Sequence, residues 1–180
     1  MCIRDRNIKA LKDYNFKYPR QVDLANEDSI DKFSSEVKND GVKVDALINN
    51  AGAFLNKPFE KISKKEFEYI FQVNVFGLSS ITRKVLPIID SKGHIVNITS
   101  MGGINGAAKF TGLSAYSSSK GAVNILTELL AEEYKEKGPS FNALAFGAVQ
   151  TEMLEEAFPG LKAPISCLLY TSPSPRDIGE

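Results

Sequence analysis

Cysteine is nearly absent from this sequence of 180 residues. The two cysteines, Cys2 and Cys167, lie near the two ends, so the long central stretch offers no pair for a disulfide. The single histidine, His94, opens a candidate strand, and no group of cysteine, histidine and carboxylate residues has the spacing of metal ligands. We therefore expect neither a disulfide framework nor a metal site, and we expect His94 to be structural.

Excess charge and long apolar runs are also missing. The 22 basic and 22 acidic residues balance, which argues against the basic footprint of a nucleic-acid-binding protein. No apolar run approaches the ~20 residues that a membrane helix needs. No signal peptide is evident, and the length suits one domain. We expect a cytoplasmic protein that has neither nucleic acid nor a membrane as its partner.

Hydrophobic patterning predicts strands that alternate with helices. The expected strands lie near 18–22, 44–48, 94–99 and 140–145, and the expected helices lie near 27–39, 64–86, 115–137 and 151–157. Asn26 and Ser63 are plausible helix N-caps, and Ser63 begins a Ser-x-x-Glu capping box. Strand-helix alternation implies parallel pairing, so the sequence predicts an α/β fold.

Tyr116 and Lys120 lie four residues apart in a candidate helix, which places both side chains on one face. A phenol ordinarily titrates near pH ~10, and a neighbouring ammonium favours the phenolate and lowers that pKa. Such a tyrosine suits proton transfer to or from a carbonyl or alcohol oxygen. Because a lone Tyr-x-x-x-Lys is more often structural, the interpretation needs support from elsewhere in the chain.

Support comes from polar and small residues that follow two candidate strands. Ser100 follows one strand, and the run Asn49-Asn50-Ala51-Gly52 follows another. Ligands bind at the carboxyl ends of strands in open α/β sheets, and small residues let a ligand approach the backbone. Asn74 lies in a mostly apolar helix, where asparagine is a poor choice for stability. Ser114 competes with Ser100 for a place beside Tyr116, and we favour Ser100 because only it follows a strand.

Together these features resemble the short-chain dehydrogenase/reductase family over roughly residues 18–153. The catalytic tetrad that the resemblance implies is Asn74, Ser100, Tyr116 and Lys120. The cofactor-binding residues that it implies are Asp23 and Leu24 beside the adenine, Asn50, Ala51 and Gly52 in the Asn-Asn-Ala-Gly motif, Tyr116 and Lys120, and Gly147, Val149 and Thr151 near the nicotinamide carboxamide. Phe146 departs from the family pattern, which usually has proline there.

The resemblance implies hydride transfer between NAD or NADP and a small-molecule carbonyl or alcohol substrate. Tyr116 would exchange the proton with the substrate oxygen, and Ser100 would hydrogen-bond that oxygen. Lys120 would lower the tyrosine pKa and hold the nicotinamide ribose. Asn74 would position a water that links Lys120 to solvent. These roles are expectations that come from the resemblance.

The resemblance also implies a parent homodimer or homotetramer that pairs through the helices near 64–86 and 115–137. Both helices are apolar beyond one stripe, which is typical of helices buried on two sides. The alternative is that they simply cover the sheet. Two alternatives to an oxidoreductase stay open: this chain is a catalytically inactive fragment, or the parent is a dinucleotide-sensing binding protein on the same fold.

We expect a partial Rossmann-like, doubly wound parallel sheet that lacks the family's first strand-helix-strand unit and its last strand. No glycine-rich phosphate-binding turn precedes Asp23. Residues 1–6 and 167–180 fit no helix or strand pattern and resemble translated sequencing-adapter DNA, so we expect both ends to be adapter-derived and to flank a partial domain at 7–166. The first remaining strand should then leave a gap beside the strand 44–48 or move into it.

Overall fold

Strands and helices alternate along the computed structural model, which describes residues 2–5, 18–41, 43–148, 154–155, 158, 160, 162 and 170–172. The strands are β1 (Cys2–Asp5), β2 (Tyr18–Gln21), β3 (Val44–Asn49), β4 (Ile89–Ser100), β5 (Ser140–Phe146) and β6 (Tyr170–Ser172). The helices are α2 (Glu27–Asn39), α3 (Lys64–Phe71), the π-helix η2 (Gln72–Gly77), α4 (Leu78–Val85) and α5 (Ser114–Glu133), and the 3-10 turns are η1 (Phe59–Lys61), η3 (Leu86–Ile88) and η4 (Met101–Gly103). The helix predicted at 151–157 falls largely outside the described residues.

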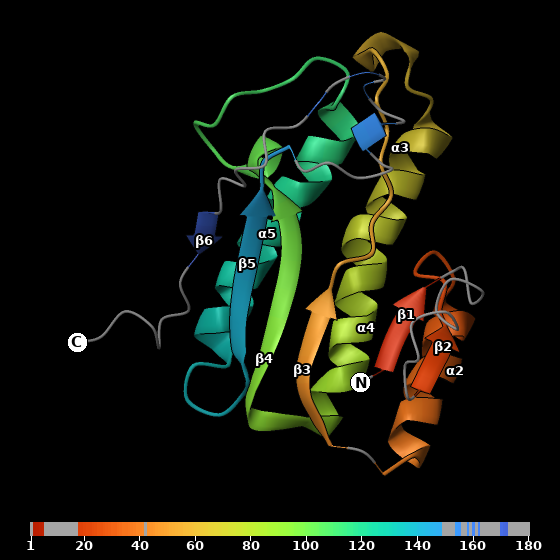
Figure 1. Ribbon diagram of the computed structural model, residues 1–180, viewed down its shortest axis with the longest axis vertical. Helices are drawn as coiled ribbons and strands as arrows, with labels where there is room; N and C mark the ends of the chain where they lie inside the picture. Colours follow the sequence, from red (N-terminus) through yellow and green to blue (C-terminus); the bar gives the residue numbers. More distant parts are fainter. Residues whose placement is uncertain are drawn as a thin grey trace.

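The main sheet has the strand order β3-β4-β5-β6, in which β3, β4 and β5 are parallel and β6 is antiparallel to β5 (Figure 1). The predicted strands β3, β4 and β5 are confirmed, although β4 begins earlier than expected, at Ile89. The short strands β1 and β6 lie in the terminal segments, where we predicted none. That prediction was wrong because backbone hydrogen bonds to the edge of a neighbouring strand need no particular side-chain pattern.

A gap separates β3 from the strand that precedes it in the sequence. β2 pairs in parallel with β1, and these two strands form a sheet of their own. Figure 1 places β1 between β2 and β3, but among the described strands neither β1 nor β2 joins the main sheet. The predicted gap is therefore confirmed. The origin of the two chain ends stays a prediction.

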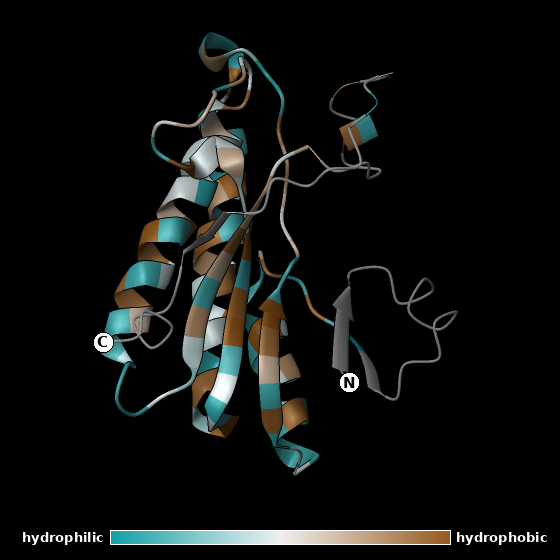
Figure 2. Cartoon of the chain, turned by 60° about the vertical axis from the view of Figure 1, so that its left-hand side comes forward, coloured by the Kyte–Doolittle hydropathy of each residue, from teal (hydrophilic) through white to brown (hydrophobic). Residues whose placement is uncertain are grey.

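The described helices cover one face of the main sheet (Figures 1 and 2). Alternate residues on that face are buried, among them Ile95 on β4 and Phe141 on β5. On the opposite face, Ile48 of β3 keeps 60% of its surface exposed. A parallel sheet normally has helices on both faces. The described residues thus confirm a partial Rossmann-like parallel sheet, of which they show one helical layer.

The helix predicted at 64–86 is divided by a wider π turn. Ser63 caps its start, because the Ser63 hydroxyl accepts a hydrogen bond from the Glu66 N–H at 3.3 Å and the Glu66 carboxylate accepts one from the Ser63 N–H at 2.8 Å. The π turn η2 then carries Asn74 and ends at Gly77. A Cβ at Gly77 would lie 2.2 Å from the carbonyl oxygen of Leu24, so the glycine permits direct contact between the turn and the segment after β2. Single-turn π segments are frequent at functional sites.

None of the helices in the described part of the chain has the length and apolar character that crossing a membrane requires.

Candidate active site

Ser100 and Tyr116 meet at the carboxyl end of β4. Ser100 is the last residue of β4, and Tyr116 lies in the first turn of α5. The two hydroxyls are hydrogen-bonded to each other. Ser114 begins the same helix, but its hydroxyl is buried and has no hydrogen-bond partner among the described residues. The contact with Tyr116 therefore supports Ser100 over Ser114.

Burial controls the protonation of Tyr116. It raises the pKa of Tyr116 above the usual value of 10.0, and the hydrogen bond with Ser100 opposes this by favouring the phenolate. The ammonium of Lys120 lies 5.8 Å from the centre of the tyrosine ring. The predicted direction, a pKa lowered by Lys120, is thus wrong for this structure, because the loss of water around the phenol has the larger effect.

Lys120 is buried below the tyrosine, with 5% of its surface exposed. Its Nζ donates a hydrogen bond to the carbonyl oxygen of Ile98 at 2.8 Å. Burial disfavours the ammonium and lowers the pKa of Lys120 from 10.5 to about 8. An ammonium has three donors, so the bond to Ile98 leaves two that could hold another oxygen.

Asn74 is 1% exposed, and its amide bonds to the protein itself. Its Oδ1 accepts a hydrogen bond from the Ala53 N–H at 2.7 Å. Its Nδ2 donates to the Ala53 carbonyl at 3.0 Å and to the Ser119 hydroxyl at 2.9 Å. The amide thus ties the π turn to the segment after β3 and to α5. The expected role of Asn74 in a water relay stays a prediction.

Two glycines, which have no side chain, let the segments around these residues pack closely. A Cβ at Gly52 would lie 3.2 Å from Asn74 Oδ1 and 3.4 Å from Lys120 Nζ. A Cβ at Gly103 would lie 2.6 Å from the backbone nitrogen of Gly121 on α5. The segment after β3 and the turn after β4 can therefore both approach the Tyr116 helix closely. This packing places the glycines that follow Ser100 next to the site.

Sequence reasoning missed two residues next to this group. The Phe54 ring packs against the Tyr116 ring, with the centroids 4.8 Å apart. Ser119 is fully buried and contacts both Asn74 and the Tyr116 backbone. A signal existed for Ser119, because position i+3 from Tyr116 lies on a neighbouring part of the helix surface. Phe54 had no such signal, since its contact with Tyr116 depends on the path of the loop.

The first asparagine of the Asn-Asn-Ala-Gly motif, Asn49, links neighbouring strands and helices through side-chain hydrogen bonds. Asn49 Nδ2 donates to Asn97 Oδ1 at 2.8 Å and to the Thr82 hydroxyl at 3.1 Å. Asn97 Nδ2 in turn donates to the Thr127 hydroxyl at 2.9 Å. This buried network joins β3 and β4 to α4 and α5.

The residues predicted to contact the cofactor differ in their exposure and in their existing contacts. The Asp23 carboxylate accepts a hydrogen bond from the Ala25 N–H at 2.9 Å, and Leu24 is 4% exposed against the π turn. Asn50 and Ala51 are exposed. Within the described part of the chain, no atom lies within 4 Å of a Cβ added at Gly147. Val149 and Thr151 lie outside the described residues.

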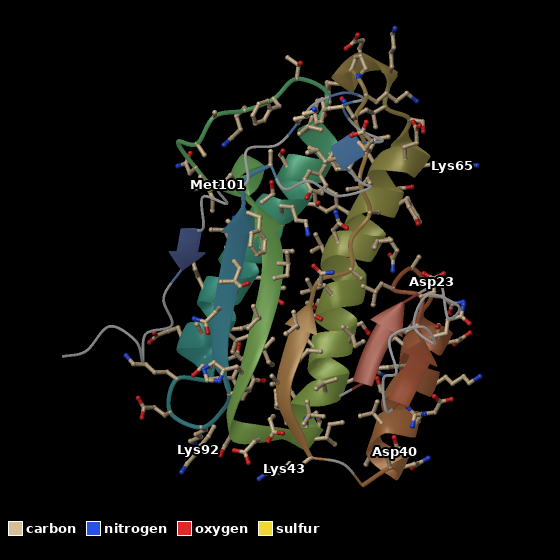
Figure 3. The ribbon with its side chains drawn as sticks, viewed as in Figure 1. Asp23, Asp40, Lys43, Lys65, Lys92 and Met101 are labelled. Atoms are coloured by element: carbon tan, nitrogen blue, oxygen red, sulfur yellow. The ribbon has the colours of Figure 1, made fainter. Side chains whose placement is uncertain are left out.

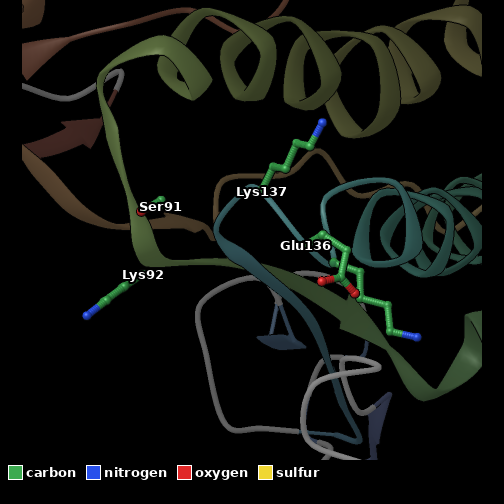
Figure 4. Close-up of a pocket in the computed structure, with 5 residues that line it drawn as sticks. Ser91, Lys92, Glu136 and Lys137 are labelled. Atoms are coloured by element: carbon green, nitrogen blue, oxygen red, sulfur yellow. The ribbon is translucent and has the colours of Figure 1, made fainter.

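Asp23 and Met101 lie beyond the ends of β2 and β4 in Figure 3, while Lys43 and Lys92 lie at the opposite edge. The hollow of about 520 Å³ that Figure 4 shows is also at that opposite edge. It is lined by Ser91, Lys92, Lys135, Glu136 and Lys137. The site around Tyr116 is therefore separate from this hollow. No group of metal-binding side chains occurs within the described residues.

Comparisons with known proteins identify relatives of this chain. L-2,3-butanediol dehydrogenase of Corynebacterium glutamicum is 40% identical over 116 residues, which are 62% of this chain and 43% of that protein. Cyclopentanol dehydrogenase of Comamonas testosteroni is 32% identical over 155 residues, which are 85% of this chain and 60% of that protein. The chain thus spans about half the length of these curated relatives.

The fold also matches solved structures. The complex of Pseudomonas aeruginosa RhlG with NADP aligns with a TM-score of 0.76 at 23% identity, over 86% of this chain and 65% of that one. A likeness at this level of identity supports the fold. The sequence pattern of the short chain dehydrogenase family matches residues 5–162 of this chain. This chain therefore belongs to the short-chain dehydrogenase family.

Proposed function

We propose that the whole protein is an NAD(P)-dependent oxidoreductase that interconverts a small-molecule carbonyl and the corresponding alcohol. The observation that carries this proposal is the hydrogen-bonded pair of Ser100 and Tyr116 with the Lys120 ammonium beneath the ring. Three groups that can donate protons gather at the carboxyl edge of the sheet, where α/β proteins bind ligands. The NADP complex of RhlG and the names of the dehydrogenase relatives support the same class of reaction.

The residues present suit a nicotinamide cofactor at this edge. Gly52 keeps clear the space beside Asn74 and Lys120, and Lys120 has donors beyond the one that bonds Ile98. Asp23, Leu24, Asn50, Ala51 and Gly147 would line the remainder of the cofactor site. The cofactor supplies or accepts the hydride. Cytoplasmic location is part of the same proposal.

Each polar side chain then has a role at a stated atom. The Tyr116 hydroxyl gives its proton to the substrate oxygen during reduction and takes it back during oxidation. Ser100 donates a hydrogen bond that stabilises charge on that oxygen or on the phenolate. Lys120 replaces the tyrosine proton from its ammonium, whose pKa of about 8 places proton loss close to neutral pH. The Asn74 amide holds the segment after β3 against α5.

A Tyr116→Phe variant tests the acid-base role. Removing one positioned proton donor typically costs ~100-fold or more in kcat. Nicotinamide absorbance should be followed for the oxidation of NADH and NADPH by a panel of ketones and aldehydes, and for the reduction of NAD and NADP by a panel of alcohols. Tyr69→Phe is the matched control, because Tyr69 is 43% exposed on α3. If the wild type turns over, an equal rate for the Tyr116 variant would contradict the proposal.

A second candidate concerns the chain as it stands. Its first glycine is Gly41, so no glycine-rich turn precedes the segment at Asp23 that would border the adenine. We propose that this chain alone binds neither dinucleotide tightly. Calorimetric titration of this chain with NADH and NADPH tests the second candidate, since micromolar binding would contradict it.

A further inference from the structure

Ser119 joins two parts of the site that the tetrad does not connect by itself. Its side chain is fully buried on α5. The hydroxyl donates to the Tyr116 carbonyl at 2.7 Å and accepts from Asn74 Nδ2 at 2.9 Å. The Ser119 hydroxyl thus donates a hydrogen bond to the helix turn that carries Tyr116 and accepts one from the π turn.

The Asn74 amide extends this connection to a third segment. It holds both backbone groups of Ala53, at 2.7 and 3.0 Å. The next residue, Phe54, packs its ring on Tyr116. The path therefore runs from Tyr116 through Ser119 and Asn74 to Ala53 and returns to Tyr116 through Phe54. A closed path of this kind limits the movement of the phenol relative to Ser100.

We propose that Ser119 is a positioning residue, which sets the location and the dry surroundings of Tyr116 and Lys120 by holding Asn74 and the Ala53 segment against α5. The proposal rests on the proposed function for its kinetic consequence, but its structural consequence stands by itself. Losing the Ser119 acceptor frees Asn74 Nδ2 from α5, so the segment at Gly52 and Phe54 can move outward and admit water to Lys120.

The neighbouring residue, Ser118, provides a matched control. The Ser118 hydroxyl also donates to backbone carbonyls of α5, at 2.6 Å to Ser114 and 3.1 Å to Ala115. Ser118 is exposed, and its hydroxyl bonds to the Ser114 and Ala115 carbonyls rather than to Asn74. Ser119→Ala and Ser118→Ala therefore both delete a hydroxyl that bonds within the helix, but only the first deletes the bond to Asn74.

The first readout needs no catalysis. Competitive acetylation of the lysines, followed across pH by peptide mass spectrometry, reports the apparent pKa of Lys120. We expect Ser119→Ala to raise it by about half a unit or more toward the ordinary value, because water reaches the ammonium. Ser118→Ala should match the wild type. Ser119→Cys, which keeps a weak donor and acceptor, should give an intermediate value and replaces Ser119→Ala if that variant does not fold.

The second readout is kinetic. If the wild type turns over, Ser119→Ala should lower kcat by ~10-fold or more and leave KM within ~3-fold, since misplacement of a reacting group affects chemistry more than binding. Absence of turnover in every variant would agree with weak dinucleotide binding by this chain alone, and the acetylation comparison would then decide on the positioning role. Acetylation profiles of Ser119→Ala and Ser119→Cys that coincide with those of wild type and Ser118→Ala would overturn the positioning role.

Discussion

At the scale of the residue, burial decides the behaviour of the two ionisable groups at the site. The sequence predicts an ammonium that lowers the pKa of Tyr116. In the structure, loss of water raises the pKa of Tyr116 and lowers that of Lys120 to about 8. Both shifts favour the neutral forms, as expected for groups in an apolar environment. Transfer of a proton from the Lys120 ammonium to a Tyr116 phenolate would therefore leave two neutral groups and no buried charge.

The buried ammonium predicts an unusual dependence of stability on pH. The pKa of Lys120 is about 8 in the folded state and 10.5 as its ordinary value, so the unfolded state binds more protons between these values. The free energy of unfolding should therefore rise with pH across this window, by up to about 3 kcal/mol. Urea unfolding at a series of pH values measures it, and Lys120→Met should remove the rise.

The control for this prediction is Lys92→Met, because Lys92 is exposed at the opposite edge of the sheet. It should leave the pH dependence unchanged. A wild-type stability that stays flat or falls between pH 8 and 10 would argue against a buried, neutralised Lys120.

At the scale of the element, the π turn at Gln72–Gly77 sets where Asn74 and Leu24 lie. Gly77 has no room for a side chain, because the nearest Leu24 atom would be 2.2 Å from an added Cβ. We expect Gly77→Ala to destabilise the fold by about 1–3 kcal/mol or more, as overpacking does. Thermal and urea unfolding measure the loss. Gly147→Ala serves as the control, since no atom of the described residues lies within 4 Å of a Cβ added there.

A comparable loss in both glycine variants would indicate that the close contact between the π turn and Leu24 is not formed.

The hydrogen bonds at the start of α3 predict that the stability of the fold decreases in acid. The hydrogen bond from Lys57 and those from Ser63 hold the pKa of Glu66 at about 2, below its usual 4.5. A lowered pKa in the folded state stabilises the fold above pH 4.5, and this stabilisation is lost as the pH falls toward 2. Glu66→Gln should reduce stability at neutral pH and flatten the decline below pH 4.5 in urea unfolding.

Glu68→Gln is the matched control on the same helix, where Glu68 lies 3.5 Å from Lys64 and both side chains are mostly exposed. Exposed i,i+4 pairs contribute little. If the two glutamine variants behaved alike in acid, the capping box would not be the source of the effect.

At the scale of the whole molecule, large apolar side chains among the described residues are exposed on the helices and on the sheet face opposite them. On the helices, Phe76 and Ile125 are each 58% exposed and Leu129 is 63% exposed. On the sheet face opposite the helices, Ile48 is 60% exposed. Exposed apolar patches often mark interfaces. The proposed homodimer or homotetramer uses the helix surface.

Charge substitutions distinguish the two surfaces. Ile125→Glu with Leu129→Glu should lower the mass of the assembly in light scattering, because a carboxylate in an apolar interface is costly. Ile48→Glu should leave an assembly through the helices intact. The reverse pattern, dissociation by Ile48→Glu only, would show that copies of this chain associate through the sheet.

The sequence was sufficient to predict those features that depend on residues close together in the chain. The capping box at Ser63 depends on residues three apart, and the strands β3, β4 and β5 follow from short apolar runs. The pairing of Tyr116 with Lys120 on one face of a helix follows from helix geometry. The family resemblance, which the family match then supported, gave the order of the tetrad.

Tertiary structure decided the contacts between segments distant in sequence. Asn74 bonds to Ala53, 21 residues earlier, and to Ser119, 45 residues later, and no local pattern specifies either partner. The water excluded around Tyr116 and Lys120, which sets the direction of both pKa shifts, depends on how those segments pack. The sequence by itself therefore determined which groups could transfer a proton. The packing, which excludes water from these groups, determined the direction in which the pKa of each one is shifted.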